Sequence, residues 1–207
     1  MSQFFTIHPE NPQARLIKSA AAIIRGGGII VYPTDSCYAL GCHIGDKAAM
    51  ERIRTIRGID ARHHLTLVCR DLSELARYAR VDNRQFRLLR AATPGSYVFI
   101  LQATRELPKR LQHPKRRTIG LRIPDHPVVD ALLAELGEPL LSSTLLLPGD
   151  AQPHTDVQEI RGQLEHQVDL ILDGGSCGIE PTTVVDLTGP APVLIRAGKG
   201  SLEPLGL

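Results

Sequence analysis

The sequence predicts an α/β protein built on a mixed β-sheet with flanking helices. The core must be aliphatic, because hydrophobic residues make up 43% of the 207 residues while aromatic residues make up only 4%. Short apolar runs typical of buried strands alternate with segments of helical periodicity. A compact turn at Thr188, Gly189 and Pro190 joins two of these runs, which predicts at least one antiparallel strand pair.

The N-terminal part is expected to begin with a helix over residues 12–25. Asn11 is predicted to cap this helix, and three consecutive glycines follow its end. A fully apolar strand is predicted over residues 28–32. It runs into a polar break over residues 33–36, which places side chains at the strand's end, as ligand-binding loops do.

Aspartates mark the starts of the next three helices. Asp46 is predicted to cap a helix that ends near residue 56, and a strand follows over residues 65–69. Asp71 and Asp82 are predicted to cap two further helices. This alternation of strands and helices fits a sheet that is covered by helices.

The second half of the chain continues the pattern. Helices are predicted over residues 128–136, with Asp125 as the cap, and over residues 157–165. No convincing linker is found, so residues 1–207 are expected to form one domain. Further strands are predicted over residues 97–101, 119–123, 140–145, 169–172, 183–187 and 193–195.

Charge and composition exclude several classes of protein. The net charge is only +2, so binding of a polyanion has to come from local clusters of cations. The first residues do not resemble a secretory signal and no later segment is apolar enough to span a bilayer, so a cytoplasmic location without a membrane partner is expected. The four cysteines, Cys37, Cys42, Cys69 and Cys177, form no C-x-x-C pair and are predicted to be plain thiols, with no metal site.

Familiar nucleotide and catalytic motifs are absent from the sequence. It has no G-x-x-x-x-G-K-[ST] loop, no G-x-S-x-G elbow and no H-E-x-x-H pair. Instead, hydroxyl-bearing residues and arginines lie on or beside the predicted strands. Such arginines are costly to desolvate unless an anion or a carboxylate meets them, which indicates a basic cleft for a phosphate-bearing ligand, either ATP, RNA or both. The alternative for each arginine is a structural ion pair with Asp or Glu.

A separate basic segment follows residue 108. It contains five permanent cations and one histidine without an acidic residue. Such a run suits a phosphate backbone and would make binding sensitive to salt, although a solvated surface loop explains it equally well. The lack of aromatic residues argues against base stacking. The five predicted RNA-binding residues are Lys109, Arg110, Lys115, Arg116 and Arg117.

Four segments resemble successive motifs of the YrdC/YciO family. They cover residues 32–41 (YPTDSCYALG), 120–127 (GLRIPDHP), 181–186 (PTTVVD) and 194–198 (LIRAG). Residues 66–75 are most similar to the YciO branch. Several motifs in the right order are more specific than any single one.

The resemblance implies a YrdC-like fold, a twisted mixed sheet around a large, positively charged concave cleft. Active members are threonylcarbamoyl-AMP synthases, which join L-threonine, bicarbonate and ATP in the pathway to threonylcarbamoyladenosine in tRNA. Mg²⁺ is expected with the ATP, and some members are associated with double-stranded RNA. The implied partners are therefore tRNA or double-stranded RNA, and not DNA.

The resemblance also assigns subsites within the predicted cleft. It places Thr34 and Tyr38 in the threonine pocket and Arg57 and Arg196 near phosphates. It places Arg122 near the carboxylate or carbamate, and makes Arg57 and Arg122 the catalytic candidates. The candidates for the nucleotide side are Ser142, Thr144 and Thr182.

Three positions differ from the motifs of the synthases. A K-x-R motif aligns with Arg57 and Ile59, an S-x-N motif aligns with Thr144 and Leu146, and a usual threonine is replaced by Val98. All three changes remove polar groups from the expected cleft. Two hypotheses follow: a weak or re-specialised synthase that binds ATP, or a non-catalytic RNA-binding protein that uses the same cationic cleft.

Overall fold

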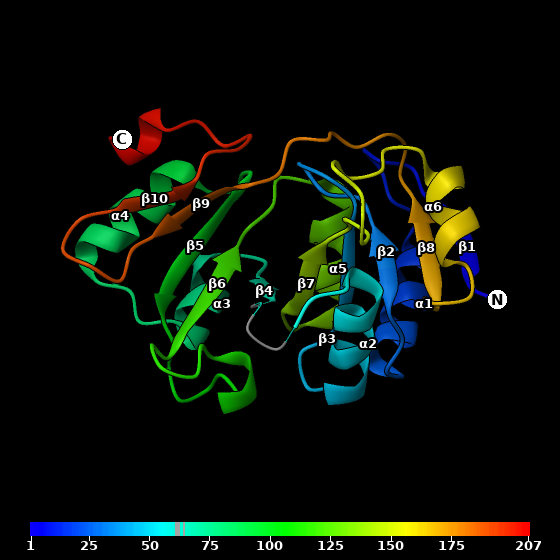
Figure 1. Cartoon of the computed structure of the whole chain (residues 1–207), viewed down its shortest axis with the longest axis horizontal. Helices are drawn as coiled ribbons and strands as arrows, with labels where there is room; N and C mark the ends of the chain where they lie inside the picture. Colours follow the sequence, from blue (N-terminus) through cyan, green and yellow to red (C-terminus); the bar gives the residue numbers. More distant parts are fainter. Residues whose placement is uncertain (61–62, 64) are drawn as a thin grey trace.

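A computed structural model describes residues 1–60, 63 and 65–207, and its strands form one ten-stranded mixed sheet (Figure 1). The strand order is β1-β8-β2-β3-β7-β4-β6-β5-β9-β10. Pairing is parallel for β1 with β8, β2 with β8, β4 with β6 and β5 with β9, and antiparallel elsewhere. The mixed sheet predicted from the sequence is confirmed. The strands are β1 (Gln3–Thr6), β2 (Ile30–Tyr32), β3 (Ala39–His43), β4 (Thr66–Val68), β5 (Tyr97–Gln102), β6 (Thr118–Arg122), β7 (Leu140–Thr144), β8 (Leu170–Asp173), β9 (Thr183–Asp186) and β10 (Val193–Arg196).

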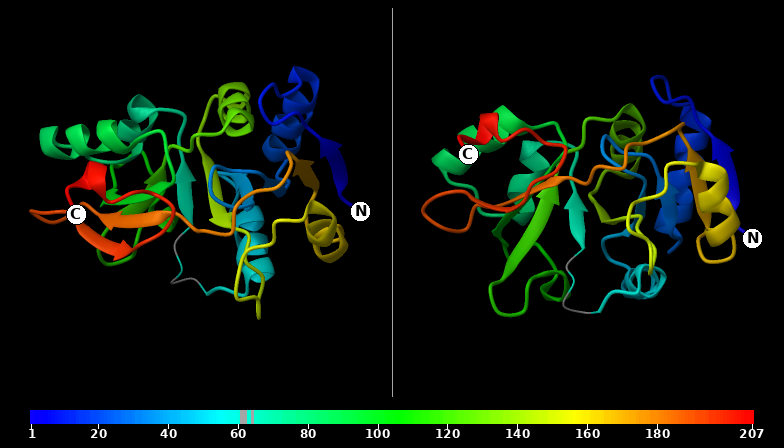
Figure 2. Two further views of the ribbon diagram at one scale, coloured as in Figure 1. Left: turned by 90° about the horizontal axis from the view of Figure 1, so that it is seen from above. Right: turned by 45° about the horizontal axis from the view of Figure 1, so that its top comes forward.

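Helices cover both faces of the sheet. Figure 2 shows α1, α3, α4 and α5 on one side and α2 and α6 on the other, and the two chain ends lie at opposite ends of the molecule. No helix in the described part of the chain is long and apolar enough to cross a membrane. The helices are α1 (Ala14–Arg25), α2 (Lys47–Arg57), α3 (Leu72–Tyr78), α4 (Asn83–Ala92), α5 (Pro127–Leu136) and α6 (Val157–Leu164), with 3₁₀ turns η1 (Lys109–Leu111) and η2 (Glu203–Leu205).

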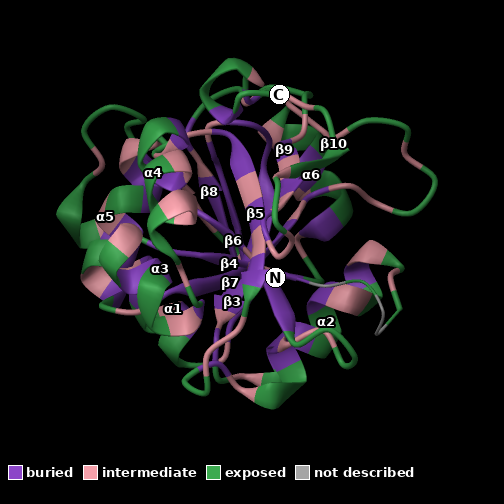
Figure 3. Cartoon of the chain, turned by 90° about the vertical axis from the view of Figure 1, so that its left-hand side faces the viewer, coloured by how far each residue is buried: buried purple, intermediate pink, exposed green. Residues whose placement is uncertain are grey.

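The core is aliphatic, as the composition predicts. One cluster packs α1 and α5 against the sheet through residues such as Ile24, Leu132 and Leu170. The other contains residues of α2, α3, α4 and α6 and includes the fully buried Phe99. Figure 3 shows the inner strands as the most buried part of the chain, with exposed residues on the outer faces of the helices and on the edge strand β10.

Most helix starts agree with the sequence prediction. The side chains of Asp46, Asp71 and Asp82 accept backbone N–H groups at the starts of α2, α3 and α4, which confirms them as caps. The prediction of Asn11 as a cap is wrong, because α1 begins later and Gln13 stands at its N-cap position without a capping side chain. The prediction of Asp125 as a cap is also wrong.

The start of α5 is capped by His126, one residue beyond the predicted cap. Its Nδ1 accepts a hydrogen bond from the N–H of Val128 (3.2 Å). The backbone N–H of Asp125 instead donates to the carboxylate of Asp35 (3.2 Å). A contact between residues distant in sequence therefore places Asp125 outside the helix.

Two strands were not predicted, the edge strand β1 and the central strand β3. The sequence of β3 contains Gly41, which weakens an intrinsic preference for strand. A Cβ atom at Gly41 would lie 2.8 Å from the Tyr32 ring and 2.7 Å from the Leu140 side chain. Glycine is therefore required where β3 passes between β2 and β7.

Candidate functional site

The connection between β2 and β3 is a turn held together by the hydroxyl of Thr34. This hydroxyl donates to the carbonyl of Cys37 (2.6 Å) and accepts from the N–H groups of Ser36 (3.2 Å) and Cys37 (3.3 Å). Tyr38 is buried, and its hydroxyl donates to the carbonyl of Gly175 (2.6 Å). Both residues expected in a threonine pocket thus have partners within the protein.

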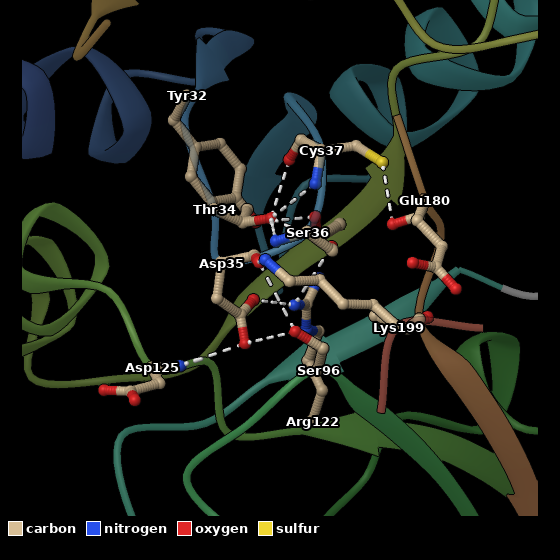
Figure 4. Close-up of polar contacts among 12 residues, drawn as sticks. Tyr32, Thr34, Asp35, Ser36, Cys37, Ser96, Arg122, Asp125, Glu180 and Lys199 are labelled. Carbon is tan, nitrogen blue, oxygen red and sulfur yellow. Dashed lines mark hydrogen bonds and ion pairs between the residues drawn. The ribbon is translucent and has the colours of Figure 1, made fainter. Parts of the chain in front are cut away.

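Asp35, in the same turn, is the centre of a buried polar network (Figure 4). Its Oδ1 pairs with Nη2 of Arg122, and the two side chains are only 8% and 7% exposed. Its Oδ2 accepts from the hydroxyl of Ser96 (3.0 Å) and from the N–H of Asp125. The ammonium of Lys199 donates to the backbone carbonyl of Asp35. Arg122 therefore forms a structural ion pair with an aspartate, which is the alternative that the sequence analysis left open for each arginine.

Gly198 brings Lys199 to this network. A Cβ atom at Gly198 would lie 2.2 Å from the carbonyl oxygen of Pro181, so only glycine allows the two backbone segments to approach so closely. The N–H of Gly198 also donates to the hydroxyl of Thr183 (3.1 Å). The segment after β10 is thereby held against the start of β9.

Two cavities that share a wall lie beside this network. The Arg57 cavity has a volume of about 570 Å³ and includes Leu146 and Glu180 in its lining. The Arg122 cavity has a volume of about 270 Å³ and includes Val98 and Thr182 in its lining. We call the two together the cleft. The residues common to both are Thr66, Ser142, Ser143, Thr144 and Arg196.

The predicted candidates fall into two groups with respect to the cleft. Thr34 and Tyr38 are absent from the described linings of both cavities. The six candidates that line the cleft are Arg57, Arg122, Ser142, Thr144, Thr182 and Arg196. The turn and the cleft meet at Arg122, which belongs to both.

Two arginines of the cleft interact with uncharged groups. Arg57, the last residue of α2, donates from Nε to the hydroxyl of Ser143 (3.2 Å) and from Nη1 to the carbonyl of Leu146. Arg196 donates to the carbonyl of Thr182 from Nε (3.2 Å) and Nη2 (2.9 Å). Among the described residues neither has a carboxylate partner. Burial lowers the pKa of both guanidinium groups, which nevertheless stay charged and can attract an anion.

Arg122, which lines the smaller cavity, has one unsatisfied donor. The Nε of Arg122 is buried and has no hydrogen-bond partner among the described residues. Nearby, the hydroxyls of Ser142 and Tyr32 are hydrogen-bonded (2.6 Å), and Ser142 also donates to the carbonyl of Leu40 (3.0 Å). Burial raises the pKa of Tyr32 to about 12, so its hydroxyl stays protonated. A buried N–H without a partner is unusual, and this one has almost no accessible surface, so it is not exposed to the cavity.

Several lining residues were not identified from the sequence, among them Thr66, Glu180, His63 and His113. Thr66 lies on β4 and is paired with Ser142 of β7, which adds a hydroxyl to the shared wall. Burial, with a smaller effect of the Arg57 charge, lowers the pKa of His63. Sequence spacing alone carries no signal for these residues, because different strands and loops bring them together.

The five cations of the basic segment have different surroundings. Arg116 lines the Arg122 cavity and lies 3.9 Å from Asp186, so the segment reaches the cleft there. Arg110 donates to the carbonyl of Gly45 (2.7 Å). The remaining three are exposed; they are Lys109, Lys115 and Arg117.

The three positions at which the resemblance implies a difference from the synthases also have distinct surroundings. Val98 lines the Arg122 cavity and Leu146 lines the Arg57 cavity, so both present alkyl groups to the cleft. Ile59 packs against the main core cluster. Two parts of the cleft wall are therefore apolar.

Thiol and metal chemistry find little support in the described residues. All four cysteines are free, and burial raises the pKa of Cys42 to about 12 and that of Cys177 to about 11. Burial also raises the pKa of the Cys37 and Cys69 thiols. Protonated thiols are poor nucleophiles and poor metal ligands. No group of three His, Cys, Asp or Glu residues suited to a metal ion occurs within the described ranges.

The family model described as "Telomere recombination", which represents the Sua5, YciO and YrdC proteins, matches residues 22–198. The chain belongs to this family. A protein of Haemophilus influenzae is 60% identical over 205 residues, covering 99% of both chains. YciO of Escherichia coli K12 is 57% identical over 204 residues, again covering 99% of both chains. A threonylcarbamoyl-AMP synthase of Halorhodospira halophila is 31% identical over 172 residues, covering 82% of this chain and 89% of the relative.

Solved structures of the Sua5/YciO/YrdC family share the fold. The crystal structure of E. coli YciO superposes with a TM-score of 0.95 and covers 99% of this chain and 100% of that one. Sua5 of P. abyssi, crystallised with L-threonine, superposes with a TM-score of 0.89 at 25% identity, covering 98% of this chain and 59% of Sua5. The family and YrdC-like fold expected from the sequence motifs are both confirmed.

Replacement of Asp35 tests whether its ion pair anchors the site. Asp35→Asn is expected to lower the free energy of unfolding by about 3–5 kcal/mol, because it leaves the Arg122 charge buried without compensation. The measurement is chemical denaturation followed by circular dichroism.

The control is Arg52→Gln, which removes an ion pair to Asp169 (3.0 Å) whose side chains are 44% and 41% exposed. This exposed pair is expected to contribute less than about 1 kcal/mol. Equal stability of Asp35→Asn and the unmodified protein would show that the pair is not an anchor.

Proposed function

We propose that the cleft binds ATP and forms threonylcarbamoyl-AMP from L-threonine, bicarbonate and ATP. The main support is the pair of adjoining cavities, in which Arg57 and Arg196 interact with carbonyl and hydroxyl oxygens and not with carboxylates. Guanidinium groups form two parallel hydrogen bonds with phosphate oxygens, so these two positions suit a triphosphate. Relatives that are threonylcarbamoyl-AMP synthases support the same activity.

The proposed reaction needs alignment more than a protein nucleophile. The amine of L-threonine forms a C–N bond with bicarbonate, and a C–O bond breaks to release water and leave a carbamate. A carbamate oxygen then attacks the α-phosphorus of ATP while pyrophosphate leaves. Arg57 and Arg196 would hold phosphate oxygens and stabilise the charge that develops on pyrophosphate. Arg122, which lies in the wall of the smaller cavity, would stabilise the carboxylate or carbamate through its positive charge. The binding of L-threonine to Sua5 supports a place for this substrate in the family fold.

Mg²⁺ is compatible with the cleft as a companion of ATP. Proteins commonly hold this ion through one or two carboxylates together with substrate phosphates. In the described lining of the Arg57 cavity the carboxylate is that of Glu180. Glu180 is exposed and could bind the ion directly or through water. Bound there, Mg²⁺ would neutralise phosphate charge.

The altered motifs favour a slow or re-specialised enzyme. Leu146 and Val98 present alkyl groups to the cleft. The motif resemblance implies an amide and a hydroxyl at these positions in the synthases. Loss of one hydrogen bond to a charged group costs about 1.5–3 kcal/mol, which corresponds to roughly 10- to 100-fold in rate or affinity. Leu146→Asn is therefore expected to increase turnover.

The first test incubates the purified protein with ATP, Mg²⁺, bicarbonate and L-threonine and detects threonylcarbamoyl-AMP by mass spectrometry. Product above a threonine-free control is expected.

Arg196→Gln is expected to lower the affinity for ATP roughly 10- to 100-fold, because charge-assisted hydrogen bonds are lost. Arg15→Gln, at an exposed position on α1, is the matched control. Absence of product, combined with unchanged ATP affinity in Arg196→Gln, would reject the proposal.

His63 predicts a pH dependence of ATP binding. Burial keeps its pKa lowered in the free protein, and a bound phosphate would raise it again. ATP binding should then take up a proton, so affinity should increase as pH falls from about 8 through the usual histidine range near 6.5. His63→Gln should reduce this increase, whereas His166→Gln, whose side chain is 72% exposed, should retain it. Calorimetry at several pH values measures the effect, and identical profiles for the His63 variant and the unmodified protein would contradict it.

RNA binding through the basic segment is a second candidate function. Its support is the exposure of Lys109, Lys115 and Arg117 together with Arg116, which reaches the cleft. Cations spread along one segment can contact several phosphates of a duplex. In this hypothesis the cleft need not turn over ATP.

The salt dependence of RNA affinity tests this candidate. Replacement of Lys115, Arg116 and Arg117 by Gln should reduce the slope of log affinity against log salt by about 2–3 for a duplex RNA. A triple Gln variant at Arg15, Lys18 and Arg87, all exposed and remote in sequence, has the same change in net charge and should retain the slope. Equal slopes in the two variants would show that the basic segment does not contact the RNA phosphates.

A further inference from the structure

The largest of the described cavities lies outside the cleft, where the chain connects β5 to β6. Its volume is about 790 Å³, and we call it the Arg117 cavity. Figure 1 shows this connection in green at the lower left, beneath β5 and β6. Its described lining has His113 in common with that of the Arg122 cavity and shares no residue with that of the Arg57 cavity. A volume of this size suits a small-molecule ligand.

The lining of the Arg117 cavity is cationic. Arg80, Arg105, Lys109 and Arg117 contribute permanent positive charges, and its described lining contains no carboxylate. All four side chains are exposed, and among the described residues none of them forms an ion pair or a side-chain hydrogen bond. A concave surface lined by one sign of charge concentrates counter-ions. The uncompensated charges therefore favour an anionic ligand.

A specific backbone conformation supports one wall of this cavity. Arg117 has a φ of 53°, in the left-handed region that residues other than glycine rarely adopt. Its N–H donates to the carbonyl of His113 (2.8 Å), and its carbonyl accepts from the N–H of Ala103 (2.9 Å). Nδ1 of His113 accepts from the N–H groups of Lys115 (3.2 Å) and Arg116 (3.1 Å). Unfavourable backbone conformations of this kind concentrate at ligand sites.

The neighbouring cavity beside α2 is a weaker candidate. It has a volume of about 330 Å³ and is also lined by cations. However, its Arg54 is paired with Glu51 (2.6 Å) and its Arg110 donates to the carbonyl of Gly45. Met50 adds apolar surface to the same lining. Its charges are therefore partly satisfied within the protein.

We infer that the Arg117 cavity binds the di- or triphosphate group of a small molecule, at a site separate from the cleft. Arginine forks match phosphate oxygens, and several cations around one concavity suit a compact ligand with several charges. A straight nucleic-acid duplex carries its phosphates along an extended line, whereas the cations of this cavity surround one open concavity. The phosphate group can come from a nucleotide or from inorganic polyphosphate, and the inference does not depend on synthase activity.

The test uses inorganic tripolyphosphate as the probe, with the Arg196→Gln chain as the background to weaken binding in the cleft. Isothermal titration calorimetry should detect binding in this background. Adding Arg80→Gln and Arg105→Gln should weaken the affinity at least tenfold. Adding Arg87→Gln and Arg90→Gln, at exposed positions on α4, has the same effect on net charge and should change the affinity less than about threefold. Thermal unfolding of each variant checks that the fold is retained.

Three results would overturn the inference. They are absence of tripolyphosphate binding in the Arg196→Gln background, equal weakening by both pairs of substitutions, and binding of duplex RNA but not tripolyphosphate through Arg80 and Arg105. ATP serves as a second probe in the same background: tighter binding than tripolyphosphate indicates a nucleotide, and equal binding indicates recognition of the phosphates alone. Both of these results support the site. Failure of the synthase assay leaves the calorimetry fully interpretable.

Discussion

The buried ion pair between Asp35 and Arg122 connects parts of the sheet that are far apart in sequence and in strand order. Asp35 follows β2, Arg122 ends β6, and β3, β7 and β4 lie between these strands. The same carboxylate accepts from Ser96 before β5, and Lys199 after β10 donates to the Asp35 backbone. A buried charge pair is stable only when its remaining polar atoms are also satisfied. Here the carboxylate is satisfied, whereas the Nε of Arg122 is buried without a partner, so the network fixes the Arg122 guanidinium in the wall of the cleft.

The three arginines of the cleft have different partners, which explains how the cleft can be part of a stable fold and still carry positive charge. Asp35 compensates Arg122, which is almost wholly buried and could not remain charged at low cost otherwise. Arg57 and Arg196 are less buried and donate to neutral oxygens. These contacts hold the guanidinium planes in place without cancelling their charge. The cleft therefore attracts anions through two residues and depends structurally on the third.

Local features of the fold could be predicted from the sequence more readily than the partners of the site residues. Asp46 and Asp82 mark helix starts because capping involves residues within one turn. The central strand β3 was missed because Gly41 is selected by its neighbours in the sheet rather than by strand preference. The partner of Arg122 could not be derived either, because Asp35 lies 87 residues away and meets it only through the tertiary fold. The family motifs identified the arginines of the cleft. The spacing of residues did not reveal that the Thr34 hydroxyl forms a hydrogen bond within its own turn.

The turn around His113 brings the two cationic regions together. Arg116 lines the Arg122 cavity, Arg117 lines the larger cavity beyond it, and His113 lies in the wall of both. These residues are held in one hydrogen-bonded unit, since the imidazole accepts two backbone N–H groups and the His113 N–H donates to the carbonyl of Thr118 (2.8 Å). Anions in the two cavities would repel each other across this unit, whereas the cations between them would reduce the repulsion. The balance of these charges would determine whether an anion in one cavity weakens or supports the binding of an anion in the other.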